Sequence, residues 1–306
     1  MNRALVRLLV LALAVMITVP AAAQERYAPV VLRVPASAWA LATGDVLTAG
    51  RSTSDLVFYN PSGLTLATGM AVSAHRWGSA ATAASLSHAV IFNGWGIGVG
   101  ARYLDFGGTD GQVTHPAELM SRGPLLSSSL AATVGLAREI KGIRIGVGVS
   151  YTEERTPTDR DGLATFEVGL GRDLGFFGFG LAVRNIGPSR ALGTTTFQPP
   201  TRASLGALLR PRPIAVFFDA GATAEIAVTR DGRIEVAGGG ELIWVPLDGW
   251  AVAARLGFRT PEQAGDIGAR PYTAGLGISL DRFSLDYALD PQRGGAVAHR
   301  IGLRMR

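Results

Sequence analysis

The sequence predicts an all-β protein, a 14-stranded antiparallel transmembrane β-barrel, and three observations lead to that prediction. The 306 residues are unusually apolar, with 47% hydrophobic residues and only 17% charged ones, where about 25% charge is usual. Beyond the N-terminus, no apolar run reaches the roughly 18 residues that a membrane-spanning helix needs. From Gly69 onward the apolar residues recur with a period of two, as in strands with one apolar face. This combination favours a closed barrel, which spans a membrane with strands.

Residues 1–23 have the features of a signal peptide. Arg3 and Arg7 precede an apolar stretch from Leu8 to Val19, and small residues follow up to Ala23. We therefore expect cleavage after Ala23 and export from the cytoplasm. The alternative is a retained membrane anchor, for which the stretch is short.

Residues 24–68 do not alternate and are predicted to form a separate N-terminal segment. The stretch Ala36–Ala49 could make a short helix, although Gly44 weakens it. Asn60 followed by Pro61 is a helix-start signal, because Asn accepts from a free backbone N–H and Pro tolerates the first helical position. The alternative is a short turn that leads into the first strand.

The barrel is expected to occupy residues 69–306. In residues 143–151, for example, isoleucine and valine alternate with arginine, glycine and serine. Most segments have about nine to twelve residues, as a tilted strand needs to cross a bilayer, whereas strands of soluble sandwiches usually have about five or six. The predicted strands are 69–77, 82–91, 95–104, 127–138, 143–151, 163–172, 177–185, 201–209, 214–228, 234–245, 250–259, 272–280, 283–289 and 297–305.

The connections between these strands differ in length. Those after even-numbered strands are brief, such as Asn93-Gly94 and the turn placed at Arg210–Pro213, and most of the others are longer, such as Thr152–Gly162. Outer-membrane barrels have short periplasmic turns and longer outer loops, so the brief turns are expected to face the periplasm.

The alternation also assigns faces. Val147 is expected to face lipid, where Val147→Arg should destabilise the barrel. The adjacent Gly146 is expected to face the lumen and to tolerate replacement by serine.

The N-terminal segment resembles that of a known family. Ala38–Asp45, followed by Asn60-Pro61-Ser62-Gly63-Leu64, is similar to the PorV/PorQ group, which is related to FadL-type outer-membrane transporters. That motif usually reads Asn-Pro-Ala-Gly-Leu, so Ser62 is a departure, and the ending Met305-Arg306 lacks the usual terminal aromatic residue. The resemblance implies an outer-membrane barrel whose N-terminal segment packs in the lumen as a hatch. The expected hatch motif consists of Gly44, Asn60, Pro61, Ser62, Gly63 and Leu64.

The resemblance implies two alternative functions. One is transport of small hydrophobic molecules through a hatch-gated lumen. The other is a non-enzymatic barrel that binds or anchors exported cargo proteins in a type IX-like secretion system. In either case, the expected partners include outer-membrane lipid and, during biogenesis, the barrel-assembly machinery.

Charged residues of both signs fall on the predicted lumenal face. They could form ion pairs that hold the hatch, or they could bind a substrate. The candidates are Arg102, Arg144, Glu167, Arg184, Arg255, Asp286 and Arg300, together with Arg202, Glu225, Glu235, Glu241 and Arg304.

Signals for other chemistry are poor. The chain has no Cys and four His, none of which pairs with another at a metal-ligand spacing. Ser87 and His88 are adjacent and point to opposite faces of a strand, so they cannot form a catalytic pair. Basic residues are dispersed singly among acidic ones, unlike a nucleic-acid-binding stripe. We therefore expect no enzymatic activity, no cofactor, no metal and no nucleic-acid partner.

Overall fold

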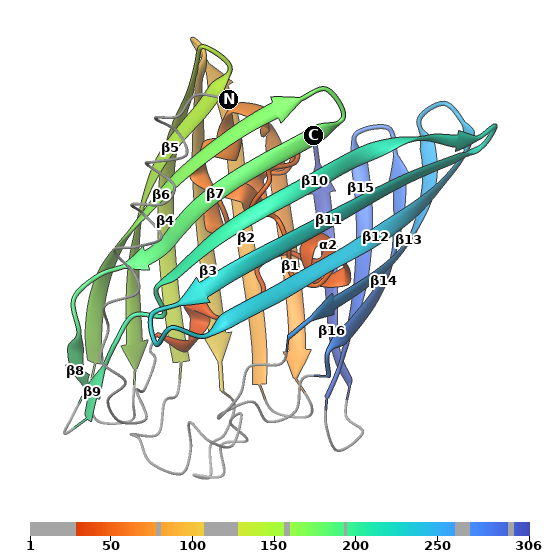
Figure 1. Ribbon diagram of the computed structural model, residues 1–306. Coiled ribbons are helices and arrows are strands. Elements are labelled where there is room, and N and C mark those ends of the chain that lie inside the picture. The colour runs from red at the N-terminus through yellow and green to blue at the C-terminus, as the bar shows by residue number, and fades with distance from the viewer. Residues whose placement is uncertain are drawn as a thin grey trace.

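The structure is a computed structural model that describes residues 29–77, 81–106, 128–155, 160–192, 195–260, 270–292 and 297–306. Fourteen of the described strands form a closed antiparallel barrel in which β1 pairs with both β2 and β16 (Figure 1). This confirms the predicted 14-stranded antiparallel barrel. The barrel strands are β1 (Gly69–Trp77), β2 (Ala81–Phe92), β3 (Trp95–Asp105), β4 (Ser128–Ile140), β5 (Ile143–Arg155), β6 (Arg160–Leu174), β7 (Phe177–Ile186), β10 (Arg202–Ala215), β11 (Phe218–Thr229), β12 (Ile234–Leu247), β13 (Trp250–Arg259), β14 (Tyr272–Leu280), β15 (Phe283–Pro291) and β16 (Val297–Met305).

The brief turns and the C-terminus share one end of the barrel, which we call the short-turn end (upper end in Figure 1). There, the backbone N–H of Arg306 donates to the carbonyl of Arg282 in the β14–β15 turn at 2.9 Å. We call the opposite end the long-loop end. It carries a two-stranded hairpin of β8 (Arg190–Leu192) and β9 (Thr195–Phe197), which the sequence did not predict.

Two connections between strands were predicted at the wrong positions. The turn expected at Arg210–Pro213 lies instead at Val216-Phe217, because β10 continues to Ala215 with a register shift between Leu209 and Arg212. An irregular register tolerates proline, which lacks a backbone donor, so the prolines here do not end the strand. The connection expected at Thr152–Gly162 is mostly strand, since β5 and β6 extend beyond their predicted ends. Its remaining residues 156–159 lie outside the described residues.

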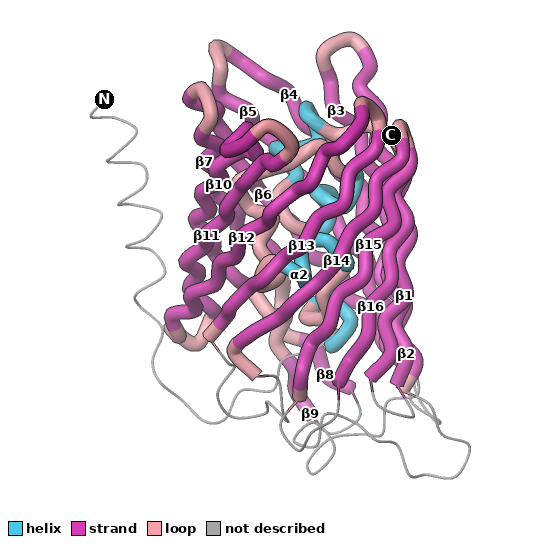
Figure 2. Tube along the Cα trace, turned by 90° about the vertical axis from the view of Figure 1, so that its right-hand side faces the viewer, coloured by secondary structure: helices cyan, strands magenta, loops and turns pink. Residues whose placement is uncertain are grey.

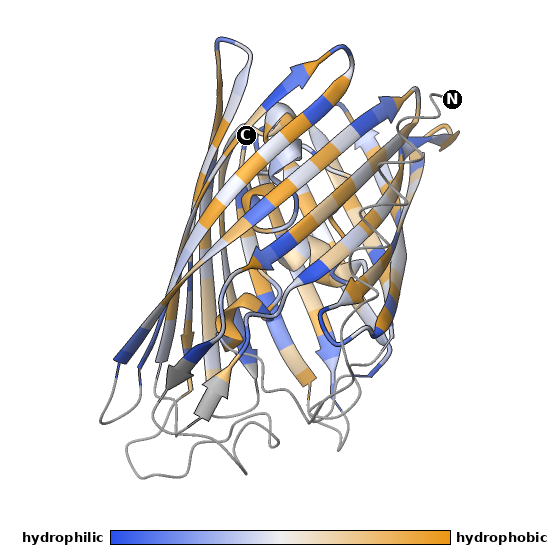
Figure 3. Ribbon diagram, turned by 60° about the vertical axis from the view of Figure 1, so that its left-hand side comes forward, coloured by the Kyte–Doolittle hydropathy of each residue, from blue (hydrophilic) through white to orange (hydrophobic). Residues whose placement is uncertain are grey.

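The outward face of the barrel is apolar. Along β2, β4 and β5, buried and exposed residues alternate, and the exposed set is rich in Ile, Val, Leu and Phe. Figure 3 shows the resulting alternation of apolar and polar residues along the strands. Val147 is 53% exposed, in agreement with its predicted outward direction.

Val147→Arg should destabilise the folded barrel by about 2–4 kcal/mol, because it places a charge on the outward face near mid-strand, where we expect lipid. Ile140→Arg, at the short-turn end of β4, is the matched control and should cost only about 0–1 kcal/mol. Urea unfolding of both variants in lipid vesicles measures the difference. Equal shifts of the two midpoints would contradict the proposed placement of the membrane.

The N-terminal segment lies inside the barrel, where Figure 2 shows its helices surrounded by strands. These helices are three 3₁₀ helices and one short α-helix, and among the described residues no helix is long and apolar enough to cross a membrane. Where a helix was expected over Ala36–Ala49, α-helical residues are confined to Ala38–Ala42, since Gly44 and Asp45 adopt φ of 83° and 63°. The helices are η1 (Val30–Leu32), α2 (Ala38–Ala42), η2 (Ser54–Phe58) and η3 (Pro61–Leu66).

Candidate functional site in the lumen

Asn60 connects three parts of the molecule. It is the N-cap of η3, and its Oδ1 accepts hydrogen bonds from the Ser62 backbone N (3.1 Å) and the Ser62 hydroxyl (2.8 Å). Its Nδ2 donates to the carbonyls of Thr48 (2.7 Å) and of Leu170 in β6 (3.2 Å). Since Asn60 is buried, each of these bonds satisfies a polar group that water does not reach.

Glycines on the inward face let the segment approach the barrel wall closely. A Cβ at Gly96 of β3 would lie 2.3 Å from the Leu64 backbone, and one at Gly180 of β7 would lie 1.9 Å from the Thr48 carbonyl oxygen. Gly44 has φ +83°, and a Cβ there would lie 2.4 Å from the Phe258 carbonyl oxygen of β13. Glycine is the residue that permits these contacts.

The expectation that Gly146→Ser would be tolerated is wrong. A Cβ at Gly146 would lie 2.3 Å from the Ser62 backbone N and 2.4 Å from the Pro61 carbonyl carbon. Alternation places Gly146 on the lumenal face, but it does not reveal that η3 packs directly against that face.

A network of ion pairs joins the segment to four strands near the short-turn end. Arg51 pairs with Glu241 of β12, which also pairs with Arg255 of β13 at 3.3 Å. Arg255 pairs with Asp286 of β15 at 2.8 Å, and Asp286 pairs with Arg304 of β16 at 2.8 Å.

Trp39 of α2 belongs to the same network. The guanidinium groups of Arg51 and Arg255 lie 4.4 Å and 5.8 Å from its ring centroid. Cation–π attraction of this kind strengthens when the cation is desolvated. The network therefore fixes both α2 and the stretch that follows it.

Two further arginines hold the segment's backbone, Arg144 directly and Arg300 through the Ser73 hydroxyl. Arg144 pairs with Asp173 at 2.5 Å and donates to the Ala49 carbonyl at 3.5 Å. Arg300 donates to the hydroxyl of Ser73 at 2.7 Å, and the Ser73 hydroxyl donates to the Ala36 carbonyl at 2.9 Å. Both arginines are among the largest fully buried side chains.

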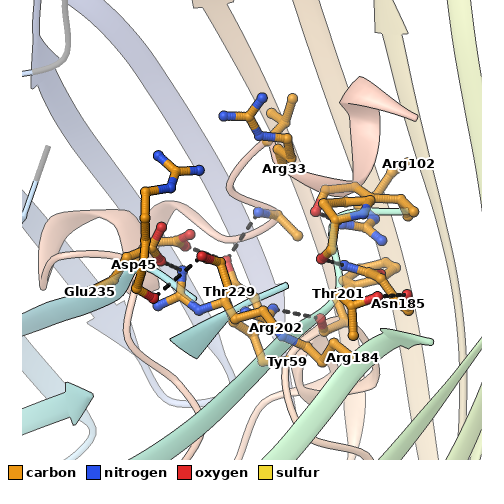
Figure 4. A pocket seen from close by; sticks show the side chains of 16 residues that line it. Arg33, Asp45, Tyr59, Arg102, Arg184, Asn185, Thr201, Arg202, Thr229 and Glu235 are labelled. Atoms are coloured by element: carbon orange, nitrogen blue, oxygen red, sulfur yellow. Dashed lines mark hydrogen bonds and ion pairs between the residues drawn. The ribbon is translucent and has the colours of Figure 1, made fainter. Parts of the chain in front are cut away.

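A cavity of about 70 Å³ lies between the segment and the long-loop ends of β7, β10, β11 and β12 (Figure 4). Its charged lining is mostly basic. The lining residues are Leu32, Arg33, Val34, Ala36, Asp45, Phe58, Tyr59, Arg102, Arg184, Asn185, Pro200, Thr201, Arg202, Thr229, Arg233 and Glu235.

Tyr59 and Asp45 form a buried hydrogen-bonded pair in the cavity wall. The Tyr59 hydroxyl donates to Asp45 Oδ1 at 2.5 Å and accepts from the Ala36 backbone N at 3.0 Å. Burial raises the pKa of the Asp45 carboxyl. Burial, together with the neighbouring Asp45, raises the pKa of the Tyr59 hydroxyl well above its ordinary value. The Tyr59 hydroxyl therefore keeps its proton and donates it in the hydrogen bond to Asp45.

The structure sorts the predicted lumenal charges into three groups, with Glu167 outside them. Arg255 and Asp286 join Glu241 and Arg304 in the network around Trp39. Arg144 binds the segment's backbone directly, and Arg300 does so through Ser73. Arg102, Arg184, Arg202 and Glu235 line the cavity. Glu167 is buried on β6 and accepts from the Ser150 hydroxyl at 2.9 Å, and Glu225 pairs with Arg202 at 2.8 Å.

Several residues of these groups come from the N-terminal segment and were not predicted. The stretch that contains them has no hydrophobic periodicity, and periodicity was the signal that assigned faces in the barrel strands. These residues are Arg51, Trp39, Asp45 and Tyr59. The family resemblance includes Trp39 and Asp45 within Ala38–Asp45, but it implies no role for either side chain. Among the described residues, no cluster of three or more His, Asp or Glu side chains is arranged to hold a metal ion.

Neither a family model nor a curated protein sequence matches this chain. Solved structures do match. The toluene transporter TbuX of Ralstonia pickettii has 11% identity and a TM-score of 0.53, over 92% of this chain and 98% of its own. The toluene transporter TodX of Pseudomonas putida has 9% identity and a TM-score of 0.56, with 92% and 98% covered. The monoaromatic hydrocarbon channel CymD has 11% identity and a TM-score of 0.52, with 91% and 98% covered. The chain therefore shares the barrel fold of these three proteins along most of its length.

Proposed function

We propose that this protein is an outer-membrane channel that passes small hydrophobic molecules, and that residues 36–66 act as its hatch. The observation that carries the proposal is the likeness in fold, over about nine-tenths of the chain, to channels named for toluene and monoaromatic hydrocarbons. The apolar outward face and the features of a signal peptide in residues 1–23 support an outer-membrane location.

The contacts of the segment suit a part that can move. It is bound to the wall by hydrogen bonds, ion pairs and apolar packing, all of which are non-covalent and can be broken and re-formed. Near β2, for example, the Ser54 and Ser87 hydroxyls lie 2.8 Å apart, and Ser87 donates to Asp55 at 2.8 Å. A displacement of the segment would open the lumen that it fills.

The PorV/PorQ resemblance rests on Ala38–Asp45 and Asn60–Leu64, and it keeps cargo binding in a type IX-like system as the second candidate. The motif forms η3 and its cap, which contact β4, β5 and β6 and could serve either function. The longest predicted outer loop falls mostly on residues 107–127, outside the described residues. Pull-down of a secreted protein by intact outer membranes, in place of hydrocarbon uptake, would favour this candidate.

Locking the segment to the wall tests the hatch. The chain has no Cys, so Ser54→Cys with Ser87→Cys introduces one disulfide where the two hydroxyls already approach to 2.8 Å. We expect oxidation to reduce initial uptake of labelled toluene by intact Gram-negative host cells about to the level of cells without the protein. A reductant should restore it.

The matched control is Ser279→Cys with Ser284→Cys, whose hydroxyls lie 2.9 Å apart between β14 and β15 within the wall. This pair should leave uptake unchanged under both conditions. Unchanged uptake in the oxidised Ser54–Ser87 pair would contradict the hatch. If the wild-type protein gave no uptake above background, hydrocarbon transport itself would be wrong.

A further inference from the structure

Three exposed arginines stand on the outward face of the barrel near the short-turn end. Each lies directly opposite a residue in the outward phase of a neighbouring strand. These pairs are Arg138 of β4 with Trp95, Arg172 of β6 with Phe179, and Arg212 of β10 with Ala220. Because residues opposite one another on paired strands share a face of the sheet, the register fixes the direction of each arginine. Most of the exposed residues around them are apolar.

Aromatic rings lie beside these arginines. The Arg138 guanidinium is 5.0 Å from the centroid of Trp95, and that of Arg212 is 5.8 Å from the centroid of Phe176 in the β6–β7 turn. Aromatic residues of membrane barrels gather where lipid meets water, at the depth of the headgroups. Arg138 and Arg172 each stand two residues before the end of their strand, so both lie near that depth.

The three arginines have no acidic partner among the residues that the structure describes, since none of them forms an ion pair within 4.0 Å. The nearest acids in the chain belong to the inward phase. Asp173 follows Arg172 but pairs with Arg144 at 2.5 Å and with Arg210 at 2.6 Å. Glu139 stands opposite the inward-facing Arg144 in register.

Several arginines at the long-loop end, by contrast, have carboxylate partners within the protein. Arg155 pairs with Glu153 at 2.7 Å, Arg160 pairs with the same carboxylate, and Arg233 pairs with Asp231 at 2.6 Å. The charges of the three arginines at the short-turn end are instead available to a molecule outside the protein.

We infer that this face binds anionic phospholipids, whose phosphate groups accept hydrogen bonds from Arg138, Arg172 and Arg212. A guanidinium carries several N–H donors in one plane, and stacking on an aromatic ring leaves those at its edge available to phosphate oxygens. The exposed Ile145, which stands opposite Arg138, and the exposed Leu174 offer apolar contact to the acyl chains.

The inference rests on the proposed outer-membrane location with the short turns in the periplasm, because the periplasmic leaflet of an outer membrane consists of glycerophospholipids. It does not rest on hydrocarbon passage, since the lipid site lies on the outward face and the hatch lies in the lumen. Uptake of toluene by cells tests the channel, and lipid binding by the purified protein tests this site, so the two can fail independently.

Native mass spectrometry of the detergent-solubilised full chain, with phosphatidylglycerol and phosphatidylcholine in equal amounts, tests the inference. Both lipids have a phosphate, but choline adds a positive charge that the arginines repel. Phosphatidylglycerol should therefore bind about tenfold more tightly or better. Equal binding of the two lipids would overturn the inference. This comparison uses the wild-type protein and does not depend on the folding of a variant.

Variants then locate the site. Arg138→Gln, Arg172→Gln and Arg212→Gln should each lower the preference for phosphatidylglycerol about threefold. The matched control is Arg270→Gln, which removes an exposed arginine at the long-loop end that donates to the Tyr272 hydroxyl at 3.0 Å. It should keep the wild-type preference. Wild-type preference in all three variants, or an equal loss in the control, would overturn the assignment.

Discussion

Deletion of residues 36–66 is expected to leave a barrel that still inserts into membranes but conducts ions several-fold more readily. About eight strands already enclose a lumen that side chains can fill, so fourteen strands need the segment to fill theirs. Trp39, Leu56, Phe58 and Leu64 of this stretch are buried against one another and the wall. Single-channel recordings in planar bilayers measure the change.

The oxidised Ser54→Cys, Ser87→Cys protein is the control for this deletion. It retains the whole segment in a fixed position and should conduct no more than the wild-type protein. Wild-type conductance in the deletion variant, together with rapid proteolysis of residues 36–66 in the folded full chain, would contradict the hatch.

Asp286→Ala should lower the free energy of unfolding by about 3–5 kcal/mol, because it leaves two buried or partly buried guanidinium groups without their shared acceptor. Asp286 is 1% exposed and pairs with both Arg255 and Arg304 at 2.8 Å. Denaturant unfolding of the protein in micelles, followed by tryptophan fluorescence, measures the loss. The signal includes Trp39, which lies beside Arg255.

Asp231→Ala is the matched control, since it removes the partner of Arg233 at the β11–β12 turn, where both side chains are about 30% exposed. Solvent-exposed ion pairs contribute about 0–1 kcal/mol, so this variant should unfold nearly like the wild-type protein. Similar losses in the two variants would show that the network around Asp286 contributes no more than a surface pair.

The strands could be predicted because each has one face toward the lumen and one away from it. Residues such as Ile145 and Val147 mark that alternation directly, and the pattern needs no knowledge of neighbouring strands. It failed at Arg210–Pro213, where turn-forming residues lie within a strand that has an irregular register. A proline alone does not distinguish a turn from such an irregularity.

The partners of the lumenal charges could not be predicted, because they depend on register and on glycines. Arg255 reaches Asp286 across β14, over Gly277, where a Cβ would lie 2.6 Å from one guanidinium nitrogen and 2.8 Å from the Asp286 carboxylate. Alternation places all three residues on the inward face, but only the alignment of three strands brings them together. The cavity could not be predicted for a second reason. Many of its lining residues belong to the N-terminal segment, whose sequence has no hydrophobic periodicity.

The lumenal segment has a consequence for biogenesis, because it precedes every barrel strand in the chain while its partners include β14, β15 and β16. The backbone N–H of Gly44 donates to the Thr273 hydroxyl, 229 positions later, and Arg300 of the final strand contacts Ser73 at the start of the barrel. Neighbouring strands need only local pairing, so a truncated chain can form most of its hairpins. Such a chain would still leave α2 without β14, β15 and β16 and would expose Trp39 and Leu41 to water and proteases. Protection of α2 from proteolysis therefore reports that β14, β15 and β16 have joined the barrel and that the barrel has closed.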